Sequence, residues 1–360
     1  MQTSRDISTT TQAWAGTLLA WYDEFARALP WRSPPGEPAP DPYRVWLSEV
    51  MLQQTTTAAV APYFTKFTTR WPTVEVLAAA DEAEVMSAWA GLGYYARARN
   101  LIACAKAVAE LGAFPDTEEG LRRLPGVGDY TAAAIAAIAF GRRAVVVDAN
   151  VERVVARLFA IGEPLPGAKR TIRAAAEGIT PDVRAGDFAQ AMMDLGATIC
   201  TTRKPRCQQC PLRGHCIALV QGDPARLPVK AAKAPKPQRE GRAFWIERPD
   251  LDGGTVWLVR RPARGMLGGM RALPDDGWAA RCDGDAVPPL EGTWTSLGMV
   301  RHSFTHFDLE LQLMLFDPGD CARLTGGEWW PVADLASAGL PTLFARAAQL
   351  ALARMGETTA

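Results

Sequence analysis

The chain carries no excess of charge of either sign, because Lys plus Arg and Asp plus Glu each number 39 among 360 residues. This balance argues against a polybasic nucleic-acid binder, an acidic tail and a basic membrane-surface patch. The longest uninterrupted apolar run, Ala132–Phe140, falls far short of the roughly 18–20 residues that span a bilayer. Residues 1–11 are polar and lack the apolar stretch of a signal peptide. We therefore expect a cytoplasmic protein that makes no contact with a membrane.

Cysteine occurs seven times, and four of the seven lie close together in the spacing C-x6-C-x2-C-x5-C: Cys200, Cys207, Cys210 and Cys216. Disulfides are not expected in a reducing compartment and in a chain of this length. Structural zinc sites use two short cysteine pairs, and only Cys207 and Cys210 form such a pair here. The longer gaps on either side suit a loop that wraps a larger object, such as an iron–sulfur cluster. The spacing predicts a metal site and favours an iron–sulfur cluster over zinc, which stays the alternative.

The length allows two or three domains, and the residue pattern changes once along the chain. We expect a helical domain at 1–222, a basic linker at 223–240 and a smaller α+β domain at 241–360. Pro62 should bend or restart a helix. Apolar periodicity predicts helices at Trp14–Arg27, Tyr43–Gln54, Val76–Ala90, Ala96–Leu111, Thr117–Leu124, Thr131–Phe140, Val151–Phe159, Arg170–Gly178 and Phe344–Met355, and strands at Thr255–Arg260 and Thr305–Phe316.

Positive charge is concentrated locally although the total is zero. Between Arg203 and Arg239 there are nine basic residues and one acidic residue, Asp223. Such a run indicates either a solvated hinge or a path along phosphates.

A short segment, Leu124–Thr131, lies between two helical patterns and contains Gly126, Val127 and Gly128. The two glycines allow a tight turn and leave backbone N–H groups unobstructed at the start of the next helix. Helix N-termini of this kind bind phosphate through those donors and the helix dipole. A purely structural turn between helices is the alternative.

Two carboxylates stand in apolar surroundings. Glu49 lies within the apolar run Val45–Leu52, and Asp148 follows the run Ala144–Val147. Burial would raise the pKa of Glu49, as a general acid near neutral pH requires. The alternatives are a helix-surface residue for Glu49 and a helix N-cap for Asp148. A pair of carboxylates is also what oxocarbenium chemistry at a sugar needs.

Five segments, taken in order, resemble the MutY-type adenine DNA glycosylases: Pro42–Thr55, Gly91–Asn100, Leu124–Thr131, Val147–Val151 and Met192–Ala197. The resemblance implies an all-α helix-hairpin-helix glycosylase domain, with the hairpin motif at about 117–140 and a 4Fe–4S cluster on the loop 200–216. A smaller α+β Nudix-like domain follows. It also implies removal of adenine mispaired with 8-oxoguanine or guanine in double-stranded DNA by a nucleoid-associated protein, expected to be a monomer.

The resemblance assigns roles by position. Glu49 matches the acid that protonates adenine N7 and then handles water, and Asp148 matches the carboxylate that stabilises the anomeric carbon or bonds to it. Tyr130 and Asn150 line the same site. Residues matching positions on the DNA are Arg32 and Gln190 near a flipped adenine, Gln54, Leu92 and Tyr94 as wedges in the duplex, and Leu52, Gln53, Gly126, Val127 and Gly128 as further contacts. Extrusion of the base is required because the glycosidic bond is inaccessible in stacked DNA.

Tyr130 bears on the type of reaction. Endonuclease III-like relatives, which also cut the strand, have a Schiff-base lysine at this position of the hairpin. A tyrosine here favours a monofunctional glycosylase that uses water. The alternatives are a bifunctional endonuclease III-like enzyme and a non-catalytic module that binds the lesion.

The second domain resembles the Nudix-like domain of the same family at Arg261–Pro274 and Arg301–Phe307. No R-E-x-x-E-E pattern follows Gly268 and Gly269, so recognition is expected instead of nucleotide hydrolysis. The resemblance gives Phe304, Thr305 and His306 the role of reading 8-oxoguanine. The chain departs from the family at Thr305, where a serine is usual, and at Ala149, where many members have glycine that tolerates unusual backbone conformations.

Overall fold

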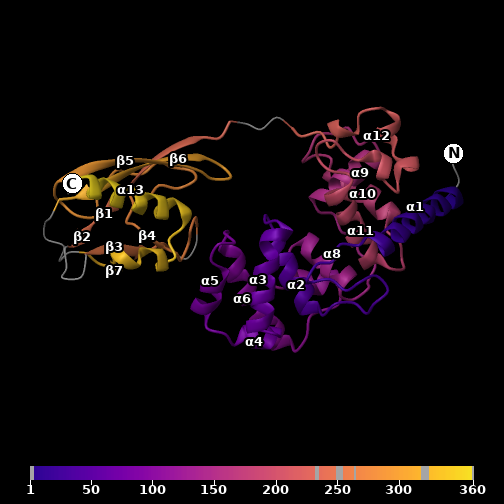
Figure 1. The fold of residues 1–360 in the computed structure, drawn as a ribbon, viewed down its shortest axis with the longest axis horizontal. Helices are drawn as coiled ribbons and strands as arrows, with labels where there is room; N and C mark the ends of the chain where they lie inside the picture. The colour runs from indigo at the N-terminus through magenta and orange to yellow at the C-terminus, as the bar shows by residue number, and fades with distance from the viewer. Residues whose placement is uncertain (1–3, 232–234, 249–253, 263–264, 318–323, 359–360) are drawn as a thin grey trace. The chain divides into compact units, whose positions relative to one another are not determined.

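A computed structural model describes residues 4–231, 235–248, 254–262, 265–317 and 324–358. The chain divides into two compact units, Met1–Ala232 and Lys233–Ala360 (Figure 1). Among the described residues, no helix combines the length and the apolar character needed to cross a membrane.

The first unit is helical, as expected. Its helices are α1 (Ser4–Phe25), α2 (Pro42–Leu52), α3 (Thr57–Arg70), α4 (Val74–Ala78), α5 (Glu82–Trp89), α6 (Ala96–Leu111), α7 (Glu118–Arg122), α8 (Asp129–Ile138), α9 (Ala149–Leu158), α10 (Lys169–Ile179), α11 (Ala185–Thr198) and α12 (Ile217–Val220). In Figure 1, α2 to α6 form one group and α9 to α12 form another, with α8 between them.

The first helix begins at Ser4, well before the predicted Trp14, and two other predicted helix boundaries were also wrong. The segment 76–90 is not one helix, because Asp81 caps α5 by accepting hydrogen bonds from the N–H groups of Ala83 and Glu84. Of the two outcomes expected at Pro62, a bend or a restart, the restart of a helix is wrong. Pro62 lies inside α3, which begins at Thr57, and the Thr56 side chain caps that helix by accepting from the Ala59 N–H. In both places a side-chain cap decides where the helix begins.

Helix α11 fixes the positions of α8 and α9 through two glycines. A Cβ on Gly186 would lie 2.5 Å from the Ala137 carbonyl oxygen of α8, and one on Gly196 would lie 2.6 Å from the Asn150 Cβ of α9. Four alanines of α8, Ala132, Ala133, Ala136 and Ala137, are all buried, and their small side chains allow the helices to approach closely. Helices α8 and α9 carry Tyr130 and Asn150 and begin next to Gly128 and Asp148. This close packing therefore sets the distance between the predicted site residues.

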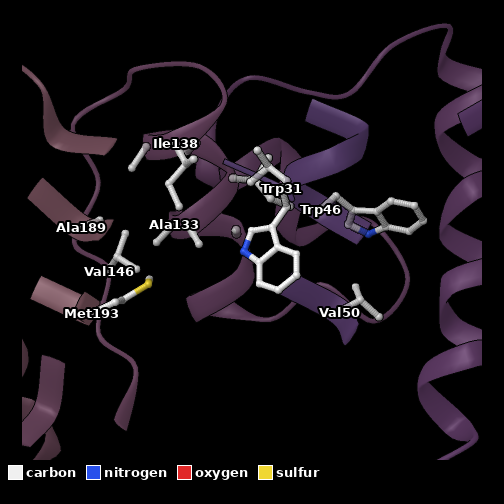
Figure 2. Close-up of a cluster of buried hydrophobic side chains, with 14 of the residues drawn as sticks. Trp31, Trp46, Val50, Ala133, Ile138, Val146, Ala189 and Met193 are labelled. Carbon is white, nitrogen blue, oxygen red and sulfur yellow. The ribbon is translucent and has the colours of Figure 1, made fainter. Parts of the chain in front are cut away.

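The first unit has one hydrophobic core among its described residues. Figure 2 shows Trp31, Trp46 and Val50 around α2, and Ala133, Ile138, Ala189 and Met193 where α8 meets α11. Trp46 is fully buried and Trp31 is 5% exposed. Burying indole rings of this size stabilises the fold strongly and leaves α2 little freedom to move.

The second unit contains two small sheets and one long helix. Strands β1 (Gln238–Trp245), β6 (Asp308–Phe316) and β5 (Trp294–Ser303) form a sheet in that order, with β1 parallel and β5 antiparallel to β6. Strand β3 (Thr255–Arg260) pairs with β2 (Glu247–Arg248), β4 (Arg271–Ala272) and β7 (Gly327–Pro331). Helix α13 (Thr342–Thr358) packs on the first sheet. The strand predicted from Thr305 begins only at Asp308, because residues 304–307 form the turn between β5 and β6.

Parts of the segment expected to be a basic linker, 223–240, make contacts within one unit or the other. Leu227 is buried against the first unit, and the Ala231 N–H donates to the Leu165 carbonyl. Strand β1 already begins at Gln238. Residues 232–234, including the predicted linker residue Lys233, lie outside the described residues. Backbone pairing near residue 165 and the β1 ladder account for the difference.

Candidate functional site

A cleft of about 790 Å³ opens in the first unit, a size typical of ligand sites. It is lined by the segment between α1 and α2, the end of α2 and the residues after it, α8, the start of α9 and one side of α11. Nine predicted site residues meet there: Arg32, Glu49, Leu52, Gln53, Gln54, Tyr130, Asp148, Asn150 and Gln190. Segments more than 100 residues apart in the sequence thus form one pocket.

Glu49 is the buried carboxyl of this pocket, with 6% of its surface exposed. Burial, which disfavours the charged form, raises the pKa of Glu49 from 4.5 to about 7. The nearby charge of Asp148 raises the pKa further, whereas a hydrogen bond from Tyr130 and the charge of Arg32 lower it. The pKa shift expected from the apolar sequence around Glu49 is confirmed, and the surface interpretation of Glu49 is wrong.

Asp148 is both a helix cap and a pocket residue. Its Oδ1 accepts a 2.7 Å hydrogen bond from the Val151 N–H, and its Oδ2 accepts a 2.8 Å hydrogen bond from the Asn150 Nδ2. The helix N-terminus and the amide therefore fix the orientation of the Asp148 carboxyl group in the cleft. Ala149 is the first residue of α9 and does not have a positive φ, so alanine fits there without backbone strain.

Tyr130 carries a pKa raised well above 10, first by burial and then by the charges of Glu49 and Asp148. Its hydroxyl therefore stays neutral and donates a hydrogen bond to the Glu49 carboxyl. The three groups form one electrostatically coupled set in the pocket.

Sequence reasoning missed the carboxylate that holds the arginines of this pocket. Asp194 is fully buried and accepts from the Arg27 Nε at 2.6 Å and from the Arg32 Nη1 at 2.8 and 2.9 Å. Arg27 and Arg32 both line the cleft. The only sequence signal was the position of Asp194 inside the segment Met192–Ala197.

The residues predicted to enter the duplex fall into two groups. Gln54 and Tyr94 are exposed and take left-handed backbone conformations, with φ of 59° and 48°. Leu92 is 6% exposed and packs in the core, so its side chain is not presented to solvent as a wedge would be. Gln53 lies in the cleft, where its Nε2 is 3.4 Å from the Thr131 Oγ1.

The hairpin connects α7 and α8 as expected. Gly126 has a φ of 74°, and a Cβ there would lie 2.6 Å from the Asn100 Cβ. Val127 is buried, while Gly128 is exposed at the start of α8. In the described part of the chain, no side chain caps α8. Its first N–H groups are therefore available to an anion such as phosphate.

The four cysteines of the 200–216 loop line one small cavity together with apolar side chains of α9, α11 and α12. The Arg157 Nη1 lies 3.2 Å from the Cys200 Sγ. Within the described ranges, no three His, Cys, Asp or Glu side chains are arranged to hold a metal ion. The thiols thus surround a cavity without converging on one point.

In the second unit, Thr305 and His306 are exposed at the turn between β5 and β6. The Phe304 ring stacks on Phe307 at 4.7 Å and packs against His302 at 4.5 Å. The Lys236 Nζ donates to the Phe304 carbonyl at 2.6 Å. The ring contacts of Phe304 and the Lys236 hydrogen bond therefore stabilise the turn, which presents two polar side chains to solvent.

Two family models match the chain. Residues 47–181 match the HhH-GPD superfamily base excision DNA repair protein, and residues 243–350 match the NUDIX domain. In the first unit, the fold is similar to a thermostable thymine-DNA glycosylase, with a TM-score of 0.53 and 30% identity over 59% of this chain and 98% of that one. A trapped endonuclease III–DNA covalent intermediate gives a TM-score of 0.50 at 22% identity, over 61% of this chain and 99% of that one, and shows likeness of fold.

Curated relatives carry the similarity across both units. The adenine DNA glycosylase of Homo sapiens is 37% identical over 370 residues, which cover 86% of this chain and 67% of the human protein. That of Mycolicibacterium smegmatis is 42% identical over 210 residues, 58% of this chain and 70% of the relative. The alignments span from 46% to 71% of the relatives' own lengths. With its helical unit and NUDIX-like unit in the expected order, the chain belongs to the adenine DNA glycosylase family.

Proposed function

We propose that the chain excises adenine paired with 8-oxoguanine or guanine in double-stranded DNA by hydrolysing the N-glycosidic bond of the flipped nucleotide. The observation that carries this proposal is the cleft in which Glu49, with a pKa of about 7, faces the same space as the capped carboxylate of Asp148. A carboxyl that is partly protonated at neutral pH beside a second carboxyl fixed by hydrogen bonds is the pair that glycosidic cleavage requires.

In this mechanism Glu49 donates its proton to adenine N7, which makes the base a better leaving group. Asp148, held in place by the Val151 N–H and the Asn150 amide, stabilises the positive charge that develops at the sugar. Arg32 and Gln190 line the same cleft and provide donors for the flipped base. Water then forms the new bond to the sugar C1′, and the Glu49 carboxylate left by the first proton transfer accepts the proton that water releases.

The reaction is monofunctional. Tyr130 occupies the hairpin position at which a bifunctional enzyme would need a lysine, and its phenol, which burial and two carboxylates keep neutral, is no Schiff-base nucleophile. Strand cleavage therefore requires alkali after excision.

A 4Fe–4S cluster held by Cys200, Cys207, Cys210 and Cys216 suits the cavity that these four thiols line. Four donors spread around a cavity fit a cubane better than a single zinc ion at about 2.3 Å from each sulfur. The cluster would hold the loop 200–216 in shape. A visible absorption spectrum tests this directly, because a colourless protein with stoichiometric zinc would overturn it.

The second unit supplies recognition of the lesion. Exposed Thr305 and His306, with Phe304 beneath them, offer a hydroxyl, an imidazole and a ring to 8-oxoguanine. The basic run Arg203–Arg239 adds phosphate contacts. We propose that the protein acts as a monomer in the cytoplasm, associated with the nucleoid.

The decisive experiment incubates the purified full chain with duplexes containing A opposite 8-oxoguanine, A opposite guanine, or A opposite thymine. We expect base release from the first two and strand cleavage only after alkali. Binding without base release would favour the non-catalytic lesion-binding module. Strand cleavage without alkali would favour the bifunctional alternative.

A further inference from the structure

Arg97 is a buried cation that lies outside the cleft and has no role in the mechanism above. It is 8% exposed, on the first turn of α6. Its guanidinium donates to five neutral oxygens: the carbonyls of Val50, Met51, Leu92 and Gly93 and the hydroxyl of Thr55, at 2.9 to 3.3 Å. The two terminal nitrogens make all five bonds, whereas the buried Nε has no hydrogen-bond partner in the described part of the chain. Burying a charge is costly, and the five bonds offset that cost only because both segments place their oxygens at the guanidinium.

The five acceptors belong to two separate segments. Three of them, from Val50, Met51 and Thr55, lie around the end of α2, just before and after Gln53 and Gln54. The other two precede Tyr94 directly, and the Arg97 guanidinium lies 5.6 Å from the centre of the Tyr94 ring. One side chain therefore connects the turn that carries Gln54 to the loop that carries Tyr94.

Both segments are strained at the residues they present. Gln54 and Tyr94 are exposed non-glycine residues with positive φ. Such conformations persist only where the surroundings impose them. The Arg97 fork bonds the Gly93 carbonyl on one side and the Thr55 hydroxyl on the other, at the residues adjoining Tyr94 and Gln54.

The same face of α6 also supports the hairpin. Asn100 lies one turn after Arg97, and its Cβ fills the space left by the missing side chain of Gly126. Arg97, Asn100, Gln53 and Gly126 line one small cavity. Helix α6 is thus the common support of three segments assigned to the DNA.

We infer that Arg97 is a positioning residue for base extrusion. It holds the Gln54 turn and the Tyr94 loop in one fixed arrangement, so that both enter the duplex together when adenine leaves the stack. This inference rests on the proposed function. It assigns Arg97 to opening the duplex and to no step of bond cleavage.

Arg97→Lys in the full chain tests the inference, because an ammonium cannot reach five acceptors in two segments as a planar fork does. Arg70→Lys is the matched control, since Arg70 is half-exposed, pairs with Glu84 and lies 4.9 Å over the Trp71 ring. A duplex with 2-aminopurine as the target base reports extrusion by fluorescence. Single-turnover release of adenine reports excision.

We expect Arg97→Lys to slow extrusion and excision together by about tenfold or more, and Arg70→Lys to leave both unchanged. Flanking mismatches, which make extrusion easier, should reduce the defect, and the pH profile of the remaining activity should match the wild type. Any of three results would overturn the inference. Arg97→Lys could extrude the base at the wild-type rate, show an equal defect on duplexes with and without flanking mismatches, or have a pH profile displaced from that of the wild type.

A folding control keeps the test decisive. If Arg97→Lys does not fold, as judged by circular dichroism, Thr55→Ala removes one acceptor and is subjected to the same two measurements. If Thr55→Ala slows extrusion and excision together, by less than Arg97→Lys is expected to, the inference is supported. Wild-type rates of both in Thr55→Ala contradict it. Failure of the wild type to release adenine would refute the proposed function instead, while the fluorescence signal still reports extrusion.

Discussion

The Tyr130 hydroxyl hydrogen-bonds the Glu49 carboxyl, and this contact opposes the burial that raises the pKa of Glu49 to about 7. The two residues come from α8 and α2, 81 positions apart in the sequence. A general acid works best when its pKa lies near the working pH. Burial and the opposing hydrogen bond from Tyr130 together therefore bring the pKa of Glu49 close to neutral pH.

Excision should fall as pH rises through about 7, because Glu49 must carry the proton. Tyr130→Phe removes the hydrogen bond that lowers the pKa of Glu49, so the alkaline limb of the single-turnover rate should move to higher pH. Tyr43 lies on α2, as Glu49 does, and Tyr43→Phe removes a hydrogen bond to the Trp71 carbonyl. This control should leave the alkaline limb in place. A limb that moves to lower pH in Tyr130→Phe would contradict the assignment.

Glu49→Gln should abolish excision and retain DNA binding, measured by gel shift on the A:8-oxoguanine duplex. It should also stabilise the fold at alkaline pH. The folded state holds the Glu49 proton up to about 7 and the unfolded state only to about 4.5, so wild-type stability falls as pH rises between these values.

The difference in unfolding free energy between Glu49→Gln and wild type should therefore grow by roughly 1–3 kcal/mol from pH 4 to pH 8. Glu110→Gln on α6, an exposed position, should show no such growth. A pH-independent difference for Glu49→Gln would show that Glu49 is not desolvated in solution.

Two substitutions separate the roles of Asp148 as anion and as cap. Asp148→Asn keeps an oxygen for the Val151 N–H and loses the charge, so excision should fall by about 100-fold or more with little change in stability. Asp148→Ala should lose the same activity and, in addition, about 1 kcal/mol of unfolding free energy. Asp81→Ala, at the cap of α5, is the control that should lose stability alone. Full activity in Asp148→Asn would remove the carboxylate from the mechanism.

The hairpin offers a matched pair of glycines. Gly126→Ala places a Cβ against Asn100 at a φ of 74°, so it should destabilise the hairpin by on the order of 1–3 kcal/mol and weaken DNA binding. Gly128→Ala meets nothing within 4 Å and has a φ of −92°, so its stability should be unchanged. Thermal unfolding and DNA affinity measured on both variants check this, and equal losses of stability would be inconsistent with the strained turn.

The sequence was sufficient where the signal is local. The spacing of the four cysteines, the glycines of the hairpin and the apolar run around Glu49 each lie within a short segment. The helical first unit and the smaller β-containing unit followed from periodicity, and the family models confirm their order. Helix boundaries at Pro62 and Asp81 were wrong, because single caps decide them more strongly than apolar periodicity does.

The zero net charge illustrates the limit of composition. It was accurate as a total, yet it did not reveal the basic run Arg203–Arg239 or the uncapped N-terminus of α8. Backbone N–H groups attract anions without adding formal charge. Composition therefore excluded a polybasic protein but not a protein that binds DNA locally.

What the sequence determined by itself is the set of candidate reacting groups and their local setting: an acid in an apolar run, a carboxylate before a helix, and four thiols in a loop. Only the tertiary structure decided that Leu92 is buried, that Asp194 holds Arg27 and Arg32, and that Arg97 connects two segments about 40 residues apart. The reason is that burial and ion pairing are sums over contacts between distant segments. Such sums exist only after the helices have packed.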